Sequence, residues 1–297
     1  MKNDEKKQNN IVKKPFRRKY IFAAAFLILL IAALVFIYFT QEPKPDPASE
    51  LVIRKEAAKI LDEDPNALTD EDFVKMKYFT LWNEELTVWQ MKRIEISDIK
   101  LLEKFSNLRV LQLNNLLYPE SAIPKWKMML SKLGIYDINK RFVLDLSPLE
   151  KLVKLKKIDI FSTPVKSIKP ISNLINLEQL ILNRVQINDL ESLKGLKNLQ
   201  RLIIVEGSIS DIEPLKELTN LQTIEIGFSQ ISNLEPLRKL KNLQYLYLYQ
   251  SAVYDLEPIK GLKNLQRLDL AHCKKITREQ VEDFQKLFPN IEITYGD

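Results

Sequence analysis

Apolar residues recur along most of this chain with a period of 22 residues. The clearest copies open at Leu177, Leu199, Leu221, Leu243 and Leu265, and the apolar residues of each copy occupy nearly the same positions. Self-similarity of this length is typical of a solenoid, in which each unit stacks on its neighbours. The pattern therefore predicts one elongated, repetitive domain.

The same template extends toward the N-terminus. Seven apolar positions from Leu86 to Phe105 fit it, a longer unit of 25 residues follows from Leu108, and the template resumes at Leu133. We therefore count nine units, which open at residues 86, 108, 133, 155, 177, 199, 221, 243 and 265.

Each unit divides into two parts with different apolar spacing. The first part alternates with period two, as in Leu246-Tyr247-Leu248, and this alternation predicts a strand. The second part, such as residues 255–259, carries apolar residues three apart and a proline, which favours 3₁₀-like turns over α-helix. The sequence therefore predicts a curved parallel β-sheet on the inside of the solenoid and 3₁₀ turns on its convex side.

The ends of such a stack need caps, because a terminal unit would expose the shared core. At the C-terminus, Thr277 and Gln280 have the spacing of a capping box. They predict a helix that carries Val281, Phe284 and Leu287 and ends before Pro289, with a last strand at Ile291 and Ile293.

The N-terminal cap is predicted to contain two helices. Leu51 to Leu61 has helical composition, and Asp64-Pro65-Asn66 interrupts it. Thr69 with Asp72 begins a second helix, which is expected to carry Phe73, Met76 and Phe79.

The repeats resemble the 22-residue leucine-rich repeat of the internalin type. Residues 220–243 show Asn-Leu-x-x-Ile-x-Ile, then Ile-x-x-Leu-x-Pro-Leu-x-x-Leu-x-Asn-Leu, and the resemblance covers residues 86 to about 293. The last unit, from Leu268 to Thr277, is similar to the cysteine-containing leucine-rich repeat. The resemblance implies an α/β leucine-rich-repeat solenoid and suggests a role in adhesion or envelope interaction.

One position departs from the family pattern. Many leucine-rich repeats carry asparagine eight residues after the opening leucine, where its amide bonds the neighbouring backbone. We expect a looser turn here, because the position holds Thr163, Val185, Gly207, Ser229, Ser251 and Cys273.

The N-terminal region has the features of a membrane anchor. Residues 21–39 are 19 consecutive apolar residues, enough for a helix of about 28 Å, which matches a hydrocarbon core of ~30 Å. Eight Lys or Arg residues precede them within residues 2–19, so the positive-inside rule places the N-terminus in the cytoplasm.

Two alternatives to an uncleaved anchor are a cleaved signal peptide and a cytoplasmic protein. A signal peptide has a shorter apolar region, of about 7–15 residues, and a small-x-small cleavage site. Tyr38 to Glu42 offers no such site. We therefore expect a single-pass protein with its repeats outside the cytoplasm. No asparagine begins an Asn-x-Ser/Thr sequence, which favours a bacterial cell membrane.

These features predict five segments. They are a basic cytoplasmic tail at 1–19, a transmembrane helix at 20–40, a Pro-rich linker at 41–50, a helical N-terminal cap at 51–85, and a leucine-rich-repeat domain with its C-terminal cap at 86–297.

The net charge of +6 comes from the basic tail. Without residues 2–19, the 45 basic and 39 acidic residues of the chain become 37 of each, so the ectodomain that follows the predicted anchor carries no net charge. Neutrality removes the charge-based case for a nucleic-acid partner. The single cysteine excludes an internal disulfide, so stability must come from the repeat core.

Catalytic chemistry has little support in the sequence. Asp269 lies on the same strand as His272 and Cys273, but Cys273 is expected to fill a buried position and His272 to leave the strand into solvent. Adjacent strand residues point to opposite faces, so His272 and Cys273 are poorly placed as base and nucleophile. Carboxylates recur four residues after the opening leucine, and Asp137 and Asp159 are expected to be neighbours about 5 Å apart. Such a pair suits acid–base work or Ca²⁺ binding, but a solvated acidic face explains it more simply. We predict no catalytic residues, no metal and no cofactor.

The inner face of the sheet is the candidate binding surface. Residues two, four and six after each opening leucine are expected to point out of the concave face. Exposed tyrosines and aliphatic side chains suit a protein interface, although aromatic residues also brace sheets through cross-strand pairs. The candidate partner-binding residues are Phe161, Ile181, Ile203, Val205, Phe228, Tyr245, Tyr247 and Tyr249, with Arg201 and Glu225 in a charged flank beside Arg184 and Glu206.

These observations support a non-enzymatic, membrane-anchored recognition domain that binds a protein, or alternatively a glycan, through the concave face. A structural spacer or assembly subunit of an envelope complex would use the convex surface instead. An envelope hydrolase would need Asp137, Asp159 or the Asp269 and His272 groups. A cytoplasmic regulator would require that residues 21–39 are not an anchor.

Overall fold

A computed structural model describes residues 47–81, 94–95, 99–114, 116–117, 143–165 and 167–296. All described residues belong to one compact unit within residues 45–297. The predicted basic tail, transmembrane helix and most of the Pro-rich linker lie outside the described residues. Within the ranges given above, no helix combines the length and the apolar character needed to cross a bilayer.

Two helices form the N-terminal cap. Helix α2 spans Pro47–Leu61 and helix α3 spans Asp70–Lys75, so both predicted helices are present. Helix α2 begins four residues before the predicted Leu51, and the end of the segment predicted as a linker at 41–50 is therefore helical. Thr69 caps α3, and the Asp72 carboxylate accepts a hydrogen bond from the Thr69 backbone N–H at 2.9 Å. This bond satisfies one of the backbone donors near the start of the helix. Phe73 points from α3 into the core and is fully buried.

The prediction that Met76 and Phe79 continue the second helix was wrong. Helix α3 ends at Lys75, and Phe79 lies in strand β1, Tyr78–Leu81. Met76, Phe79 and Leu81 have the spacing that opens a repeat, so this segment belongs to the sheet although it falls inside the region assigned to the cap. Phe79 still packs in the core, where its ring lies 5.2 Å from that of Phe105.

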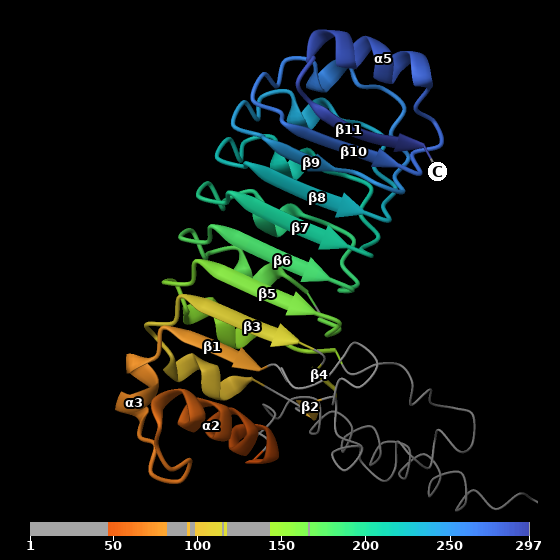
Figure 1. Cartoon of the computed structure of the whole chain (residues 1–297). Coiled ribbons are helices and arrows are strands. Elements are labelled where there is room, and N and C mark those ends of the chain that lie inside the picture. The colour runs from red at the N-terminus through yellow and green to blue at the C-terminus, as the bar shows by residue number, and fades with distance from the viewer. Residues whose placement is uncertain are drawn as a thin grey trace, which may run out of the picture. The chain divides into compact units, whose positions relative to one another are not determined.

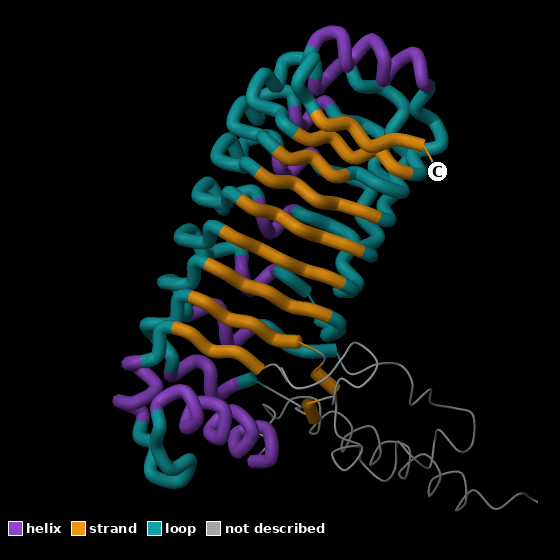
Figure 2. Tube along the Cα trace, viewed as in Figure 1, coloured by secondary structure: helices purple, strands orange, loops and turns teal. Residues whose placement is uncertain are grey.

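The repeats form one parallel sheet of nine strands, shown from its open face in Figures 1 and 2. A separate pair of short strands, β2 (Ile94–Glu95) and β4 (Leu116–Leu117), lies outside this sheet. After β1, the sheet order is β3 (Val110–Asn114), β5 (Lys157–Phe161), β6 (Gln179–Asn183), β7 (Arg201–Val205), β8 (Thr223–Gly227), β9 (Tyr245–Tyr247), β10 (Arg267–Ala271) and β11 (Glu292–Gly296).

The register of the first strands corrects two of the nine predicted units. Phe79 pairs with Leu111, and Leu111 pairs directly with Ile158. No strand from the units placed at 86 and 133 can therefore stand between β1, β3 and β5. The predicted strands of those units, near residues 89–91 and 136–138, lie outside the described residues.

The second halves of the same two units were placed correctly. Ile99, Leu102 and Phe105 are buried around the 3₁₀ helix η1 (Lys100–Lys104), and Leu146 and Leu149 are buried around η3 (Ser147–Lys151). The first two repeats are therefore longer than 22 residues: each carries extra chain between its strand and its 3₁₀ turn.

Short 3₁₀ helices line the side of the core opposite the sheet, as the three-residue apolar spacing predicted (Figure 2). Their start is fixed by a polar side chain. The Asp211 carboxylate accepts a hydrogen bond from the Glu213 backbone N–H at 2.8 Å, and equivalent residues do the same in other repeats. The remaining elements are η4 (Lys169–Ile171), η5 (Glu191–Leu193), η6 (Glu213–Leu215), η7 (Glu235–Leu237) and η8 (Glu257–Ile259).

Asparagine side chains link successive repeats through the Asn-Leu pair of the repeat motif. Each lies directly before an opening leucine, and its amide donates to a backbone carbonyl of the preceding repeat. Asn198 donates to Ile175 at 2.8 Å, and Asn220 donates to Lys197 at 2.8 Å. Asn176, Asn242 and Asn264 make the same bond. These bonds satisfy carbonyls that the turns would otherwise leave without a protein partner.

The looser turn expected after each strand is not observed. Backbone bonds between repeats continue through it: the Arg184 N–H donates to the Val205 carbonyl at 2.9 Å, and the Gln250 N–H donates to the Ala271 carbonyl at 2.8 Å. The turn is regular because one residue in each repeat adopts a left-handed conformation, with φ between 50° and 60°. These residues are Ser162, Arg184, Glu206, Phe228, Gln250 and His272.

The C-terminal cap forms as predicted. Helix α5 spans Arg278–Leu287; the Thr277 N–H donates to the Gln280 side chain at 2.9 Å, and the Gln280 N–H donates to the Thr277 hydroxyl at 3.2 Å. Phe284 is fully buried and stacks on Phe288 at 4.8 Å between ring centroids. Leu287, in contrast, is 56% exposed. Strand β11 then completes the sheet, so the core is covered at its C-terminal end.

Candidate functional site

The side of the nine-stranded sheet that faces away from the core is here called the sheet face. Strands β5 and β6 alternate between buried and partly exposed residues. Because the strands pair in parallel register, equivalent positions of successive repeats lie side by side and form rows across the sheet. The residues expected to point out of the sheet do so. The row four residues after the opening position contains Thr80, Gln112, Asp159, Ile181, Ile203, Glu225, Tyr247 and Asp269.

The centre of the sheet face is apolar. Ile203 and Val205 lie on β7, and each is only 8% exposed although it points away from the core. Ile181 pairs with Ile203 across the neighbouring strand and is partly exposed. These aliphatic side chains therefore form an apolar floor that lies low on the outward side of the sheet.

Tyr249 lies flat across β8 instead of projecting into solvent. A Cβ atom at Gly227 would stand 2.2 Å from Cε2 of the Tyr249 ring, so the ring occupies the space that any other residue would fill. The Tyr249 hydroxyl donates to the Glu225 carboxylate at 3.1 Å, and Phe228 meets the ring edge-on with centroids 5.7 Å apart. Burial, reinforced by the Glu225 charge, raises the pKa of Tyr249, so its hydroxyl stays a donor.

Sequence reasoning placed Tyr249 on this face but missed the role of Gly227. The available indication was small: the chain has six glycines, and Gly227 occupies an outward position next to β9, which carries Tyr245 and Tyr247 and is followed by Tyr249. A glycine within a strand often marks the close approach of another group.

The other two tyrosines are held differently. The Tyr245 hydroxyl donates to the Gln266 side chain at 3.0 Å. The guanidinium of Arg267 lies 5.7 Å from the centroid of the Tyr247 ring and pairs with Glu292 at 3.3 Å. Both rings are half-buried. The hydroxyls of Tyr245 and Tyr249 and the ring of Tyr247 thus each have a partner within the protein, which orders these side chains before any other molecule binds.

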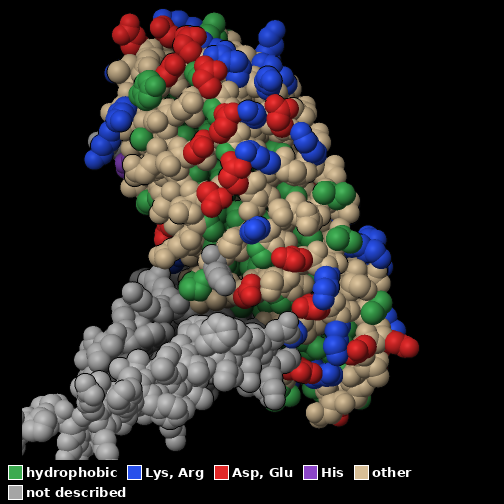
Figure 3. Space-filling view, turned by 180° about the vertical axis from the view of Figure 1, so that it is seen from behind, with side chains coloured by type: hydrophobic (Ala, Val, Ile, Leu, Met, Phe, Trp, Pro, Cys, Tyr) green, Lys and Arg blue, Asp and Glu red, His purple; other side chains and the backbone are tan. Residues whose placement is uncertain are grey.

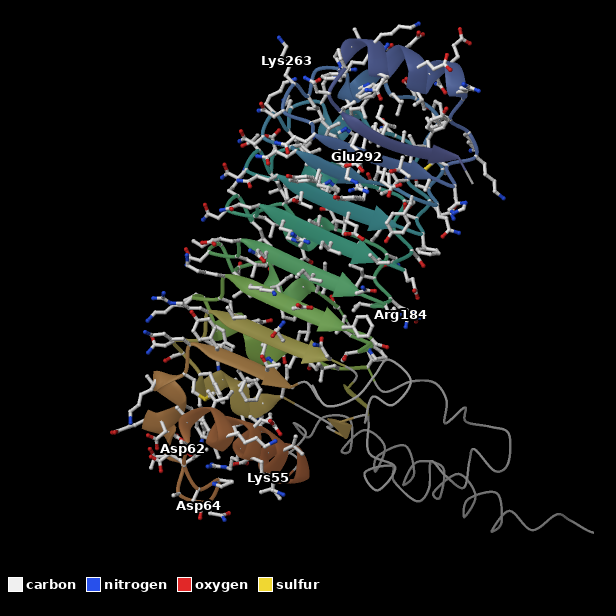
Figure 4. The ribbon with its side chains drawn as sticks, viewed as in Figure 1. Lys55, Asp62, Asp64, Arg184, Lys263 and Glu292 are labelled. Atoms are coloured by element: carbon white, nitrogen blue, oxygen red, sulfur yellow. The ribbon has the colours of Figure 1, made fainter. Side chains whose placement is uncertain are left out.

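The C-terminal ends of the strands add a second aromatic contact. Arg184 stands beyond the end of β6 (Figure 4), with its guanidinium 5.8 Å from the Phe161 ring centroid and 3.1 Å from the Glu206 carboxylate. Of the charged flank expected from the sequence, only Arg184 and Glu206 form an ion pair. Glu225 bonds Tyr249, and Arg201 is exposed.

The carboxylate pair expected at Asp137 and Asp159 was wrong. Asp159 lies between Gln112 and Ile181 in the sheet, because β3 pairs directly with β5. Gln112 donates to Asp159 at 3.1 Å, and Lys157 lies 3.5 Å away. Asp137 lies outside the described residues. Across the described ranges, no three His, Cys, Asp or Glu side chains gather in a group that could hold a metal ion.

Cys273 and His272 occupy the positions that the sequence predicted. Cys273 is 6% exposed, and its thiol donates to the Leu248 carbonyl at 3.1 Å. His272 is exposed and left-handed, with φ of 57°. A nucleophile and its base must lie within hydrogen-bond reach, and a buried thiol beside an outward imidazole does not provide that geometry.

Comparison with solved structures relates this fold to internalins. Internalin C2 from Listeria monocytogenes is 23% identical, with a TM-score of 0.66 and a match that covers 86% of this chain and 99% of internalin C2. A second internalin of that organism is 20% identical over 86% of this chain and 94% of its own, with a TM-score of 0.46. A leucine-rich-repeat protein of Leptospira interrogans is 23% identical over 67% of this chain and 58% of its own, with a TM-score of 0.48.

No protein-family model and no curated protein sequence matches this chain. The likeness to internalin C2 shows the leucine-rich-repeat fold, and function has to be argued from the surface of this molecule.

Proposed function

We propose that this chain is a non-enzymatic, membrane-anchored recognition protein that binds a protein partner through the sheet face. One observation carries the proposal: the outward side of the sheet bears an apolar floor at Ile203 and Val205, next to three ordered tyrosines. Tyrosine offers a large contact area at a low cost in side-chain entropy, and interfaces are enriched in it.

The opposite surface has a different character. Seen from behind, Lys and Arg side chains are interspersed with Asp and Glu (Figure 3). Many of these charges pair within one turn, such as Lys216 with Glu213 at 2.5 Å and Arg238 with Glu235 at 2.6 Å. A surface of short, exposed ion pairs suits solubility. This contrast favours recognition by the sheet face over a spacer or assembly role of the convex surface.

Replacement of Tyr245 and Tyr247 together by alanine is expected to weaken partner binding at least tenfold. Both changes remove ordered aromatic area at an interface where such residues contribute most of the binding energy, about 2 kcal/mol or more for a strong contact. Cross-linking on intact cells would first identify the partner, and titration of the purified pair would then measure its affinity.

Tyr254→Ala is the matched control, since Tyr254 is 55% exposed and follows β9 outside the sheet face. Its affinity should equal that of the unchanged protein. Loss of binding in Tyr254→Ala, with the double variant unaffected, would instead support the convex surface as the binding side.

The proposal of a membrane anchor rests on residues 21–39 and on the basic residues before them. In intact cells, an external protease is expected to digest the repeat domain and to spare an epitope fused before Met1. The full-length chain should also remain in the membrane fraction after an alkaline carbonate wash. A mature N-terminus near residue 40, found by mass spectrometry, would show cleaved export, and protection of both ends would show a cytoplasmic protein.

A further inference from the structure

Arg201 differs from the other charged side chains of the sheet face. It is exposed, and it forms no ion pair or side-chain hydrogen bond with any residue that the structure describes. The other charged groups in these rows have partners. Lys157 pairs with Asp159, Arg184 with Glu206, Arg267 with Glu292, Glu225 accepts from Tyr249, and Asp269 accepts from the Ala271 N–H.

The neighbours of Arg201 suit an incoming carboxylate. Gln179 and Thr223 flank it in register on β6 and β8, and both side chains can donate hydrogen bonds without adding negative charge. A planar guanidinium binds a carboxylate through two parallel hydrogen bonds. A row of three donors therefore crosses the sheet at this point.

An apolar floor begins on the same strand. Ile203 and Val205 follow Arg201 on β7 and point to the same side, about 7 Å and about 13 Å along the strand. Val205 is in register with Gly227, over which the Tyr249 ring lies. The hydroxyl of that tyrosine and the carboxylate of Glu225 satisfy each other, so this end of the surface presents ring carbon rather than a free charge.

We propose that the sheet face recognises a protein segment that places a carboxylate on Arg201 and an uncharged apolar or aromatic side chain on the Ile203, Val205 and Tyr249 floor, about 7–13 Å away. This inference rests on the proposed function, and it adds the chemical class of the partner. Arg201 sets the required charge, and the floor sets the required side chain.

The test is a peptide-display selection on the full-length chain in phosphatidylcholine nanodiscs, with empty nanodiscs used to remove background. The probe is a random library of peptides about twelve residues long. Selected peptides are expected to carry Asp or Glu two to four residues from an aromatic or aliphatic residue, a spacing that extended backbone converts to about 7–13 Å.

Charge reversal provides the decisive comparison. Arg201→Glu should weaken a selected peptide at least thirtyfold, and a new selection on that variant should enrich Lys or Arg where Asp or Glu stood before. Arg201→Lys should retain part of the affinity. Because Arg201 is exposed, unchanged thermal unfolding should show that each variant is folded.

Lys197→Glu is the matched control, since it makes the same charge change in the repeat that directly precedes that of Arg201, on a turn instead of the sheet face. Equal weakening by Lys197→Glu would reveal nonspecific charge attraction and overturn the inference. Peptides that lose binding with the Tyr245 and Tyr247 replacements but not with Arg201→Glu would also overturn it, while leaving the proposed function intact. Peptides insensitive to every sheet-face change would refute the proposed function itself.

Discussion

Gly227→Ala is expected to weaken partner binding about thirtyfold, or ~2 kcal/mol, and to lower the free energy of unfolding by about 1–3 kcal/mol. The added Cβ would lie 2.2 Å from Cε2 and 2.3 Å from Cζ of Tyr249, well inside contact distance. The ring would have to leave β8, and its hydrogen bond to Glu225 would break. Titration with the partner and denaturant unfolding would measure the two effects.

Gly195→Ala is the control for adding a methyl group, because its Cβ would meet only the Ser172 carbonyl oxygen, at 3.7 Å. It should leave binding and stability nearly unchanged. A double-mutant cycle then tests the contact itself: with Tyr249→Ala already present, Gly227→Ala should cost much less stability than it does alone. Additive losses would contradict the proposed packing of the ring on the glycine.

The regular repeats were predictable because one rule fixes them. From Leu155 onward, a leucine opens each 22-residue copy, and the strand, the 3₁₀ turn and the buried positions follow from the spacing alone. Capping was predictable for a similar reason, since Thr277 with Gln280 and Thr69 with Asp72 are local signals that need no tertiary contact.

The first two repeats were misjudged because their period is interrupted. Met76 replaces the opening leucine, and extra residues separate each strand from its 3₁₀ turn. Apolar residues inside such an insertion can match a loose template by chance, as those near Leu86 and Leu133 did. Leu111 pairs with Ile158 only because the repeats stack into one sheet, and no local sequence pattern predicts this pairing.

The residues of the sheet face were predictable, but the surface that they form was not. Period-two alternation placed Tyr245, Tyr247 and Tyr249 on one side of the sheet. Only the three-dimensional structure shows that Tyr249 lies over Gly227 of β8, and that Glu225 accepts a hydrogen bond from Tyr249 while Arg201 is exposed. Long side chains choose among rotamers according to neighbours in other repeats, which the spacing of one repeat does not specify.

Phe284→Ala is expected to lower the free energy of unfolding by about 3–5 kcal/mol, as large-to-small changes at buried aromatic residues do. Phe284 is fully buried and stacks on Phe288. It packs at the C-terminal end of the repeat core, which would otherwise be open to solvent. In a solenoid each repeat is stabilised mainly by its neighbours, so damage to a cap acts first on the repeats beside it. Amide exchange should therefore accelerate in β10 and β11 and stay slow in β6 and β7.

Leu287→Ala is the natural comparison, because Leu287 lies on the same helix but is 56% exposed. Its replacement should change stability by less than about 0.5 kcal/mol. Equal losses for Phe284→Ala and Leu287→Ala would mean that α5 contributes through helix formation and not through its buried face. Uniform acceleration of amide exchange from β5 to β11 would mean that the repeats unfold as one cooperative unit. The stability of a repeat would then not depend mainly on the repeats beside it.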